Sequence, residues 1–187
     1  MATELTIEKL ITAIKSDDAD ARTTAWLGAG QLGAKPLKPL AAVAANGPLE
    51  VSRAAKRAMW KIVRTVGDPD ASGKEDVCAE LVDLLDDSQA VAIRREVLWM
   101  LSEIGGDKQV PAIADLLGDK DLCEDTRMVL ERIPGEASLS ALKTGFAEAA
   151  EQFKPNLAQS LRKRGVTVEG YPCQKLVPNR ETKVKAI

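Results

Sequence analysis

Apolar residues recur along most of the chain at intervals of three and four positions, which is the spacing of one face of an α-helix. Ala25, Ala29 and Leu32 form one such series, and comparable series follow at later points. These are Met59, Val63 and Val66; Val97, Leu101 and Ile104; and Val129, Leu130 and Ile133. A helix with a single apolar stripe needs a neighbour to cover it, so the pattern predicts helices that pack against one another.

The ends of these series are alike, which indicates an internal repeat. The segments are Gln31-Leu32-Gly33, Thr65-Val66-Gly67, Glu103-Ile104-Gly105, Arg132-Ile133-Pro134 and a weaker Lys163-Arg164-Gly165, spaced by 34, 38, 29 and 31 residues. Glycine after the last apolar residue is expected to end the helix by taking the left-handed conformation. The stretch from Asp68 to Gly73 is rich in turn residues and reads as an inserted loop, which explains the longest spacing.

Each unit reads as a first helix, a short polar turn and a second helix that carries the apolar stripe. Three of the turns contain aspartate, which is a good N-cap for the helix that follows. They are Ser16-Asp17-Asp18, Asp86-Asp87-Ser88 and Gly118-Asp119-Lys120-Asp121, with Asn46-Gly47-Pro48 in the second unit. The helical pattern stops after Gly165. We expect a repeat domain over residues 1–165 and a non-helical tail over 166–187, which either caps the last unit or holds a partner.

Several of these helices resemble HEAT-like repeats of the phycocyanobilin-lyase type. The similar segments are Ala21-Arg22-Thr23-Thr24-Ala25 with Leu32-Gly33, Ile93-Arg94-Arg95-Glu96-Val97 with Ile104-Gly105, and Val110-Pro111-Ala112-Ile113. The second and fourth units depart from the pattern, with Lys56 and Cys123 in place of the arginine. The resemblance implies an all-α fold, a right-handed α-solenoid of about five two-helix HEAT-like repeats whose second helices line the concave surface.

The composition narrows the chemistry that the chain can perform. Histidine is absent, which removes the commonest general base and the commonest metal ligand. Cys78, Cys123 and Cys173 are widely spaced and form neither a disulfide framework nor a paired-cysteine metal motif. We therefore predict a protein that is not an enzyme and has no metal and no cofactor. The chain has no long apolar run and no secretory signal pattern, so we expect a cytoplasmic protein without a membrane partner.

A helical wheel places all three tryptophans and several cations on one surface of the second helices, away from the apolar stripe. The predicted partner-binding residues are Trp26, Arg53, Arg57, Trp60, Lys61, Arg64, Arg95, Trp99 and Arg127. Tryptophan and arginine are the residues most enriched in binding hot spots. Two readings stay open: Trp26 and Trp60 lie at the stripe edge and can instead fill gaps between repeats, and the basic row can be a solvated face. Trp99 points farther away and is expected to be exposed or to face a ligand.

Three functions are compatible with these features. We favour a scaffold or adaptor that binds another protein or peptide through the concave face. The second is nucleic-acid binding, as in the HEAT-like alkylpurine DNA glycosylases; the cations beside Trp60 favour it, and a pI near 5.4 opposes it. The third is a bilin-lyase-like subunit with Cys123 or Cys173 as nucleophile, although no histidine is available to activate a thiol.

Overall fold

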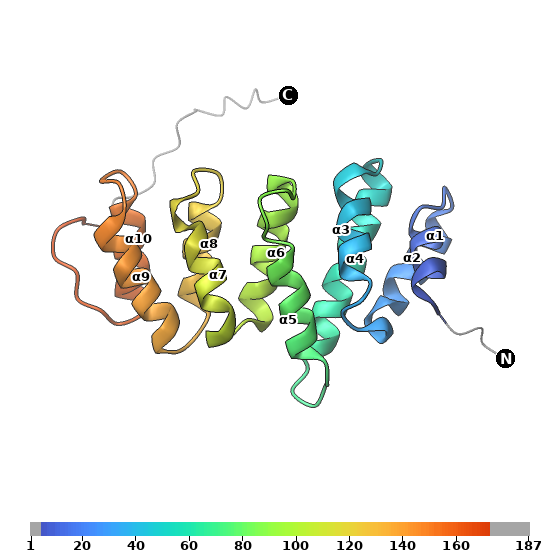
Figure 1. Cartoon of the computed structure of the whole chain (residues 1–187), viewed down its shortest axis with the longest axis horizontal. Helices are drawn as coiled ribbons and strands as arrows, with labels where there is room; N and C mark the ends of the chain where they lie inside the picture. Colours follow the sequence, from blue (N-terminus) through green and yellow to red (C-terminus); the bar gives the residue numbers. More distant parts are fainter. Residues whose placement is uncertain (1–4, 173–187) are drawn as a thin grey trace, which may run out of the picture.

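All regular structure in residues 5–172, the range that a computed structural model describes, is helical. The α-helices are α1 (Ile7–Ile14), α2 (Ala19–Gly28), α3 (Leu37–Asn46), α4 (Leu49–Val66), α5 (Lys74–Asp83), α6 (Val91–Ile104), α7 (Val110–Ala114), α8 (Cys123–Arg132), α9 (Glu136–Glu148) and α10 (Lys154–Lys163). Short 3-10 turns follow α2 and flank α7. Successive helices form five pairs that stand side by side in a row (Figure 1). The predicted all-α solenoid of two-helix repeats is confirmed.

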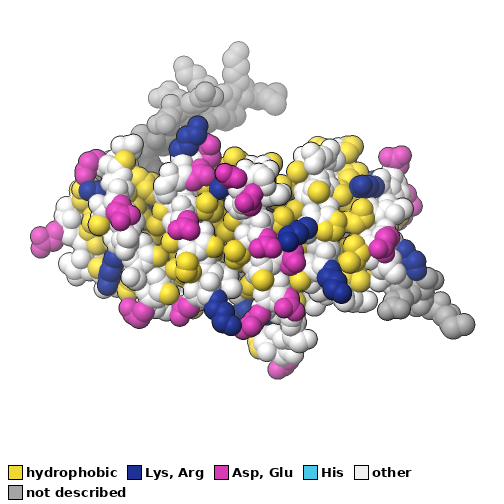
Figure 2. Space-filling view, viewed as in Figure 1, with side chains coloured by type: hydrophobic (Ala, Val, Ile, Leu, Met, Phe, Trp, Pro, Cys, Tyr) yellow, Lys and Arg dark blue, Asp and Glu magenta, His cyan; other side chains and the backbone are white. Residues whose placement is uncertain are grey.

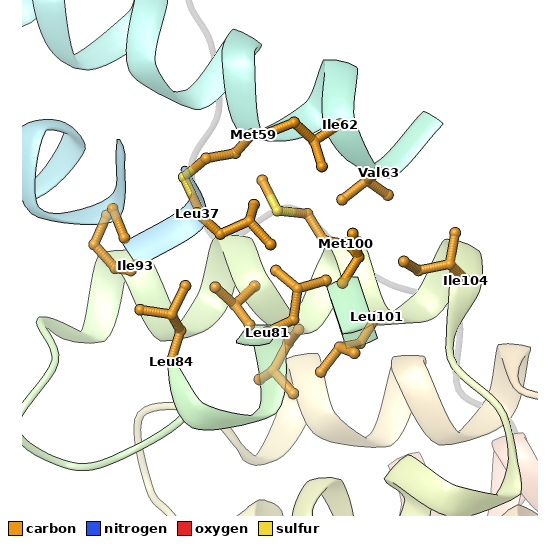
Figure 3. Packing of buried hydrophobic residues seen from close by; sticks show 14 of the residues in the cluster. Leu37, Met59, Ile62, Val63, Leu81, Leu84, Ile93, Met100, Leu101 and Ile104 are labelled. Carbon is orange, nitrogen blue, oxygen red and sulfur yellow. The ribbon is translucent and has the colours of Figure 1, made fainter. Parts of the chain in front are cut away.

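The apolar stripes meet in one core that runs through the array. The stripe residues of α4, α6 and α8 are buried, as are Ala25 and Ala29 of the first pair, while Leu32 is partly exposed. Figure 3 shows the middle of this core, where Leu37 of α3, Met59 of α4 and Met100 of α6 converge with side chains of α5. Each fully buried side chain of this size stabilises the fold by about 1.5–3 kcal/mol. The repeats are therefore held together by continuous burial between neighbouring pairs.

The glycines that end the second helices differ from the prediction in how they act. Gly33 and Gly165 have positive φ angles of 63° and 82°. Gly67 and Gly105 have φ angles of −77° and −66°, which any residue adopts. A Cβ atom at Gly105 would lie 2.5 Å from the carbonyl oxygen of Leu101 and 3.3 Å from Ile133 Cδ1. At that position a side chain would collide first with the last turn of its own helix and then press on Ile133 of the next repeat, and the left-handed ending predicted there is wrong.

The polar turns stabilise each pair in two ways. Asp18 caps α2 as predicted, because its carboxylate accepts a hydrogen bond of 2.9 Å from the backbone N–H of Asp20. No side chain caps α6 or α8, whose N-caps are Ala90 and Leu122. Instead the Arg94 guanidinium, almost fully buried, donates to the carbonyl oxygen of Leu85 at 2.9 Å and pairs with Asp119 at 3.2 Å. Arginine at this repeat position thus ties down the turn between the two helices.

The chain beyond α10 folds back on the last pair. The guanidinium of Arg162 donates to the carbonyl oxygens of Val168, Gly170 and Tyr171 at 2.7–2.9 Å. The side chains of Val166 and Val168 pack against the core, and the Tyr171 hydroxyl donates to Glu151 at 2.8 Å. These residues are non-helical, as predicted. The remainder of the predicted tail, residues 173–187, lies outside the described range, and the boundary at 165 stays a prediction.

The array has two different broad faces. The first helices of the pairs, α1, α3, α5, α7 and α9, lie in front in Figure 1 and form the face seen in Figure 2, where acidic, basic and apolar side chains are mixed. Behind them lie the second helices, which contact one another most extensively where α2 meets α4 and where α6 meets α8. Within residues 5–172 no helix is long and apolar enough to cross a membrane.

Candidate functional site

The nine predicted partner-binding residues all belong to the second helices. We call the surface formed by α2, α4, α6, α8 and α10 the second-helix face. Trp26 comes from α2; Arg53, Arg57, Trp60, Lys61 and Arg64 from α4; Arg95 and Trp99 from α6; and Arg127 from α8. Their surroundings divide this face into two halves, one at α2 and α4 and the other from α6 onward.

Five of the nine residues surround a single pocket between α2 and α4. Trp26, Arg57, Trp60, Lys61 and Arg64 line this hollow of about 250 Å³, which we call the α2–α4 pocket. The Arg57 guanidinium carbon lies 6.0 Å from the centroid of the Trp26 ring, and that of Arg64 lies 5.3 Å from the Trp60 ring. Both distances are those of a cation–π contact. Two aromatic walls, each with a guanidinium at its face, therefore form the pocket.

The cations of the pocket have no acidic partner in the described part of the chain. Arg57, Lys61 and Arg64 form no ion pair there, and Arg57 and Arg64 are exposed to solvent. Arg53, one turn earlier on α4, differs because it pairs with Glu50 on its own helix at 2.7 Å. The pocket therefore carries three positive charges whose guanidinium and ammonium donors are available to an added anion.

The tryptophans of α4 and α6 are each fixed by an acid from the following second helix. The Trp60 indole N–H donates to Glu96 at 2.6 Å, and that carboxylate also pairs with Lys56 at 3.2 Å. The Trp99 indole N–H donates to Asp125 at 3.0 Å. All three tryptophans are half-buried. Trp60 thus both packs between repeats and lines the pocket, and the two readings that the sequence left open are combined in one residue.

Trp26 lacks the acid that the other two tryptophans have. Its indole nitrogen is buried and has no hydrogen-bond partner within residues 5–172. When the second helices are aligned at Lys56, Arg94 and Cys123, Glu96 and Asp125 occupy the same position, and the residue at that position on α4 is Ala58. Leaving a buried donor unpaired costs about 1–3 kcal/mol. The pocket is therefore built around an unsatisfied indole N–H, whereas the indole N–H groups of Trp60 and Trp99 are paired.

The predicted cations of α6 and α8 are engaged within the protein. The guanidinium of Arg95 pairs with Asp125 at 2.7 Å and donates to the carbonyl oxygen of Asp121 at 2.7 Å. The structure differs most from the prediction at Arg127, which is buried with 9% of its surface exposed. Its guanidinium contacts Glu124, Glu131 and the hydroxyl of Ser160. Arg127 therefore holds α8 to α10 and presents no free donor on the face.

Two carboxyl groups in the Arg127 cluster have perturbed acidities. Burial alone raises the pKa of Glu131, but hydrogen bonds from Lys163 and Ser160 and the charge of Arg127 outweigh it, so the pKa is lowered. The pKa of Glu124 is likewise lowered, because hydrogen bonds from Arg127 and Asn156 outweigh burial. Both side chains are thereby kept ionised as partners of the buried guanidinium.

The sequence reading missed the acids that pair with this face. The sequence carries a signal for them. The repeat pattern has an arginine near the start of each second helix, a position that Arg94 occupies on α6 and Cys123 on α8, and Glu96 and Asp125 each lie two residues after it. An acid recurring at one repeat position, opposite a tryptophan of the previous unit, indicates an inter-repeat contact. Ser160 carried no such signal, because the fifth unit departs furthest from the pattern.

Comparison with known proteins gives a likeness of fold. No protein family matches the sequence, and no curated protein is similar to it. Among solved structures, a designed armadillo repeat protein has 13% sequence identity and a TM-score of 0.36, over 84% of this chain and 99% of the designed chain. These comparisons assign the chain to no family.

Proposed function

We propose that this chain is a non-catalytic scaffold that binds another protein or peptide through its second-helix face. The observation that carries the proposal is the α2–α4 pocket, where two half-buried indoles surround a hollow together with three cations that form no ion pair in the described chain. Buried aromatic and arginine side chains are the usual anchors of protein interfaces. Elsewhere on the face the corresponding groups are satisfied within the protein, so the pocket is where a partner gains most.

Nucleic-acid binding is the second candidate, favoured by the row of cations on α4 beside Trp60. A strand that followed the face beyond α4 would, however, meet Glu96, Asp125, Glu124 and Glu131 on α6 and α8. Phosphate chains gain affinity from a continuous track of cations. Among the predicted cations, those that form no ion pair within residues 5–172 all lie on α4, which favours a protein partner.

A bilin-lyase-like role gains no support from Cys123, which is the predicted nucleophile that lies within the described residues. Burial raises the pKa of the Cys123 thiol, which lowers the fraction of nucleophilic thiolate at neutral pH. Cys173, the other predicted nucleophile, lies outside the described residues.

Photo-cross-linking tests the scaffold proposal directly. A photoreactive phenylalanine derivative replaces Leu27, which is 51% exposed on α2, or Lys143, which is exposed on the first helix α9. After irradiation in a lysate of the source cell, mass spectrometry identifies the captured proteins. We expect a protein that is captured from position 27 and not from position 143, and that binds the purified chain. Capture from position 143 alone would place recognition on the other face and contradict the proposal.

A further inference from the structure

We propose that the α2–α4 pocket recognises a negatively charged side chain, a carboxylate or a phosphorylated hydroxyl, on a short acidic segment of the partner protein. The inference deepens the scaffold function and rests on it. The juxtaposition that carries it is the meeting of Arg57, Lys61 and Arg64 around the faces of Trp26 and Trp60, with no carboxylate of the described chain paired to any of the three cations.

The charge of the pocket selects the sign of the ligand. Three cations within one hollow repel each other, and an anion that accepts hydrogen bonds from two or three of them removes that repulsion. Arginine is suited to carboxylates and phosphates because its planar fork donates two parallel hydrogen bonds. The guanidinium groups of Arg57 and Arg64 are already placed over aromatic rings, so less conformational entropy is lost when they bind.

The size of the pocket selects the length of the ligand. A hollow of about 250 Å³ holds one amino-acid side chain, and it is smaller than a typical drug-sized site of about 300–1,000 Å³. Its aromatic walls suit the aliphatic stem of a glutamate or the body of a phosphorylated residue. A short peptide segment therefore places one anionic side chain in the pocket and lays its backbone on the surrounding face.

The borders of the pocket argue for a short acidic segment over a long polyanion. Toward α6 the next charged group is Glu96, held by Trp60 and Lys56. On the α2 side Leu27 follows Trp26 in the chain and is half exposed, which offers an apolar contact. We therefore expect an acidic residue with an apolar neighbour, and little tolerance for further acids on the α6 side.

Peptide binding to the full chain tests the inference. Three fluorescein-labelled dodecapeptides serve as probes: one rich in glutamate and leucine, the same peptide with two glutamates replaced by phosphoserine, and a lysine–leucine control. We expect the acidic probes to bind by fluorescence anisotropy and the lysine probe not to bind. The triple variant Arg57→Gln/Lys61→Gln/Arg64→Gln is expected to weaken binding at least tenfold. Binding of the phosphorylated probe alone would identify phosphate as the anion, and equal binding of both would identify a carboxylate as sufficient.

A matched variant separates the pocket from overall charge. Lys35→Gln/Lys74→Gln/Lys143→Gln removes the same number of charges from exposed positions that form no ion pair in the described part of the chain. It should bind the acidic probes like the wild type. Equal weakening in both triple variants, binding of the lysine probe, or failure of both acidic probes to bind would overturn the inference. So would tighter binding of a single-stranded oligonucleotide that depends on the same three cations.

The pocket's own tryptophans give a second readout. In a Trp99→Phe background only Trp26 and Trp60 remain, and their emission should change when an acidic peptide binds. A probe that binds without changing this emission lies elsewhere, and the assignment to the pocket would then fail. The cross-linking result at position 27 is independent of these probes. A captured partner together with inert acidic probes would overturn the anionic ligand and leave the scaffold function standing.

Discussion

The two halves of the second-helix face use similar residues in opposite ways. At α2 and α4, Arg57, Lys61 and Arg64 are unpaired in the described chain and the Trp26 indole N–H is unsatisfied. From α6 to α10, Arg95 and Arg127 are paired with acids of their own or the next helix. An arginine on this face is therefore available to a partner only where no acid of its own helix or of the next second helix pairs with it.

The two halves also contribute differently to the stability of the fold. In the α6–α10 half, polar contacts between repeats stabilise the array, and removing one partner leaves a charge or donor buried. In the α2–α4 half, the cations Arg57, Lys61 and Arg64 are left for an added ligand and contribute little to folding. The difference predicts opposite responses to substitution in the two halves.

The largest expected effect is at Arg127. Replacing Arg127→Met keeps most of the side-chain volume and leaves Glu131 and Ser160 without their buried partner. Breaking a buried ion pair from one side costs about 3–5 kcal/mol, and we expect about 3 kcal/mol here because Glu124 remains partly solvated. Arg57→Met in the other half should change stability by less than about 0.5 kcal/mol. Urea unfolding followed by circular dichroism measures both, and similar shifts in the two variants would remove the distinction.

Lowering the pH should destabilise the α6–α10 half by protonating Glu131, which belongs to the cluster around Arg127. The lowered pKa of Glu131 means that its contribution to stability is present above the ordinary value of 4.5 and is lost as the pH falls through the lowered pKa. Wild type should therefore lose more stability between pH 7 and pH 3 than Glu131→Gln does. The effect is smaller than that of Arg127→Met, because protonation neutralises one member of the cluster. Glu148→Gln, an exposed glutamate on α9, is the control and should follow the wild type.

Removing the segment after α10 is expected to have the next largest effect on the free energy of unfolding. Removing residues 166–187 takes away the three carbonyl acceptors of Arg162 and the packing of Val166 and Val168. We expect a loss of about 2 kcal/mol, seen as a melting temperature lower by a few degrees. An unchanged melt would show that the segment does not cap the array. Acidic-peptide binding at the distant α2–α4 pocket should be retained in the truncated chain.

The sequence predicted the helices and their pairing because apolar periodicity is a local property. Met59, Val63 and Val66 identify a buried stripe without knowledge of its neighbour. The role of Gly105 was not predictable in this way, because it depends on the backbone path after α6, which brings position 105 against the carbonyl oxygen of Leu101 and beside Ile133. The contact between Arg127 and Ser160 was missed for a related reason, because Ser160 lies 33 residues away in the unit where the repeat pattern is weakest.

The smallest and most specific test concerns the indole N–H groups themselves. Benzothienylalanine keeps the shape of tryptophan and replaces the N–H donor by sulfur. At Trp60 and Trp99 it removes a hydrogen bond to a carboxylate and should cost about 1.5 kcal/mol each in unfolding free energy. At Trp26 it removes a donor that is already buried and unpaired, so stability should be unchanged or higher by up to about 1 kcal/mol. A loss at Trp26 equal to that at Trp60 would mean that its N–H is satisfied, and the two halves of the face would then differ in their cations alone.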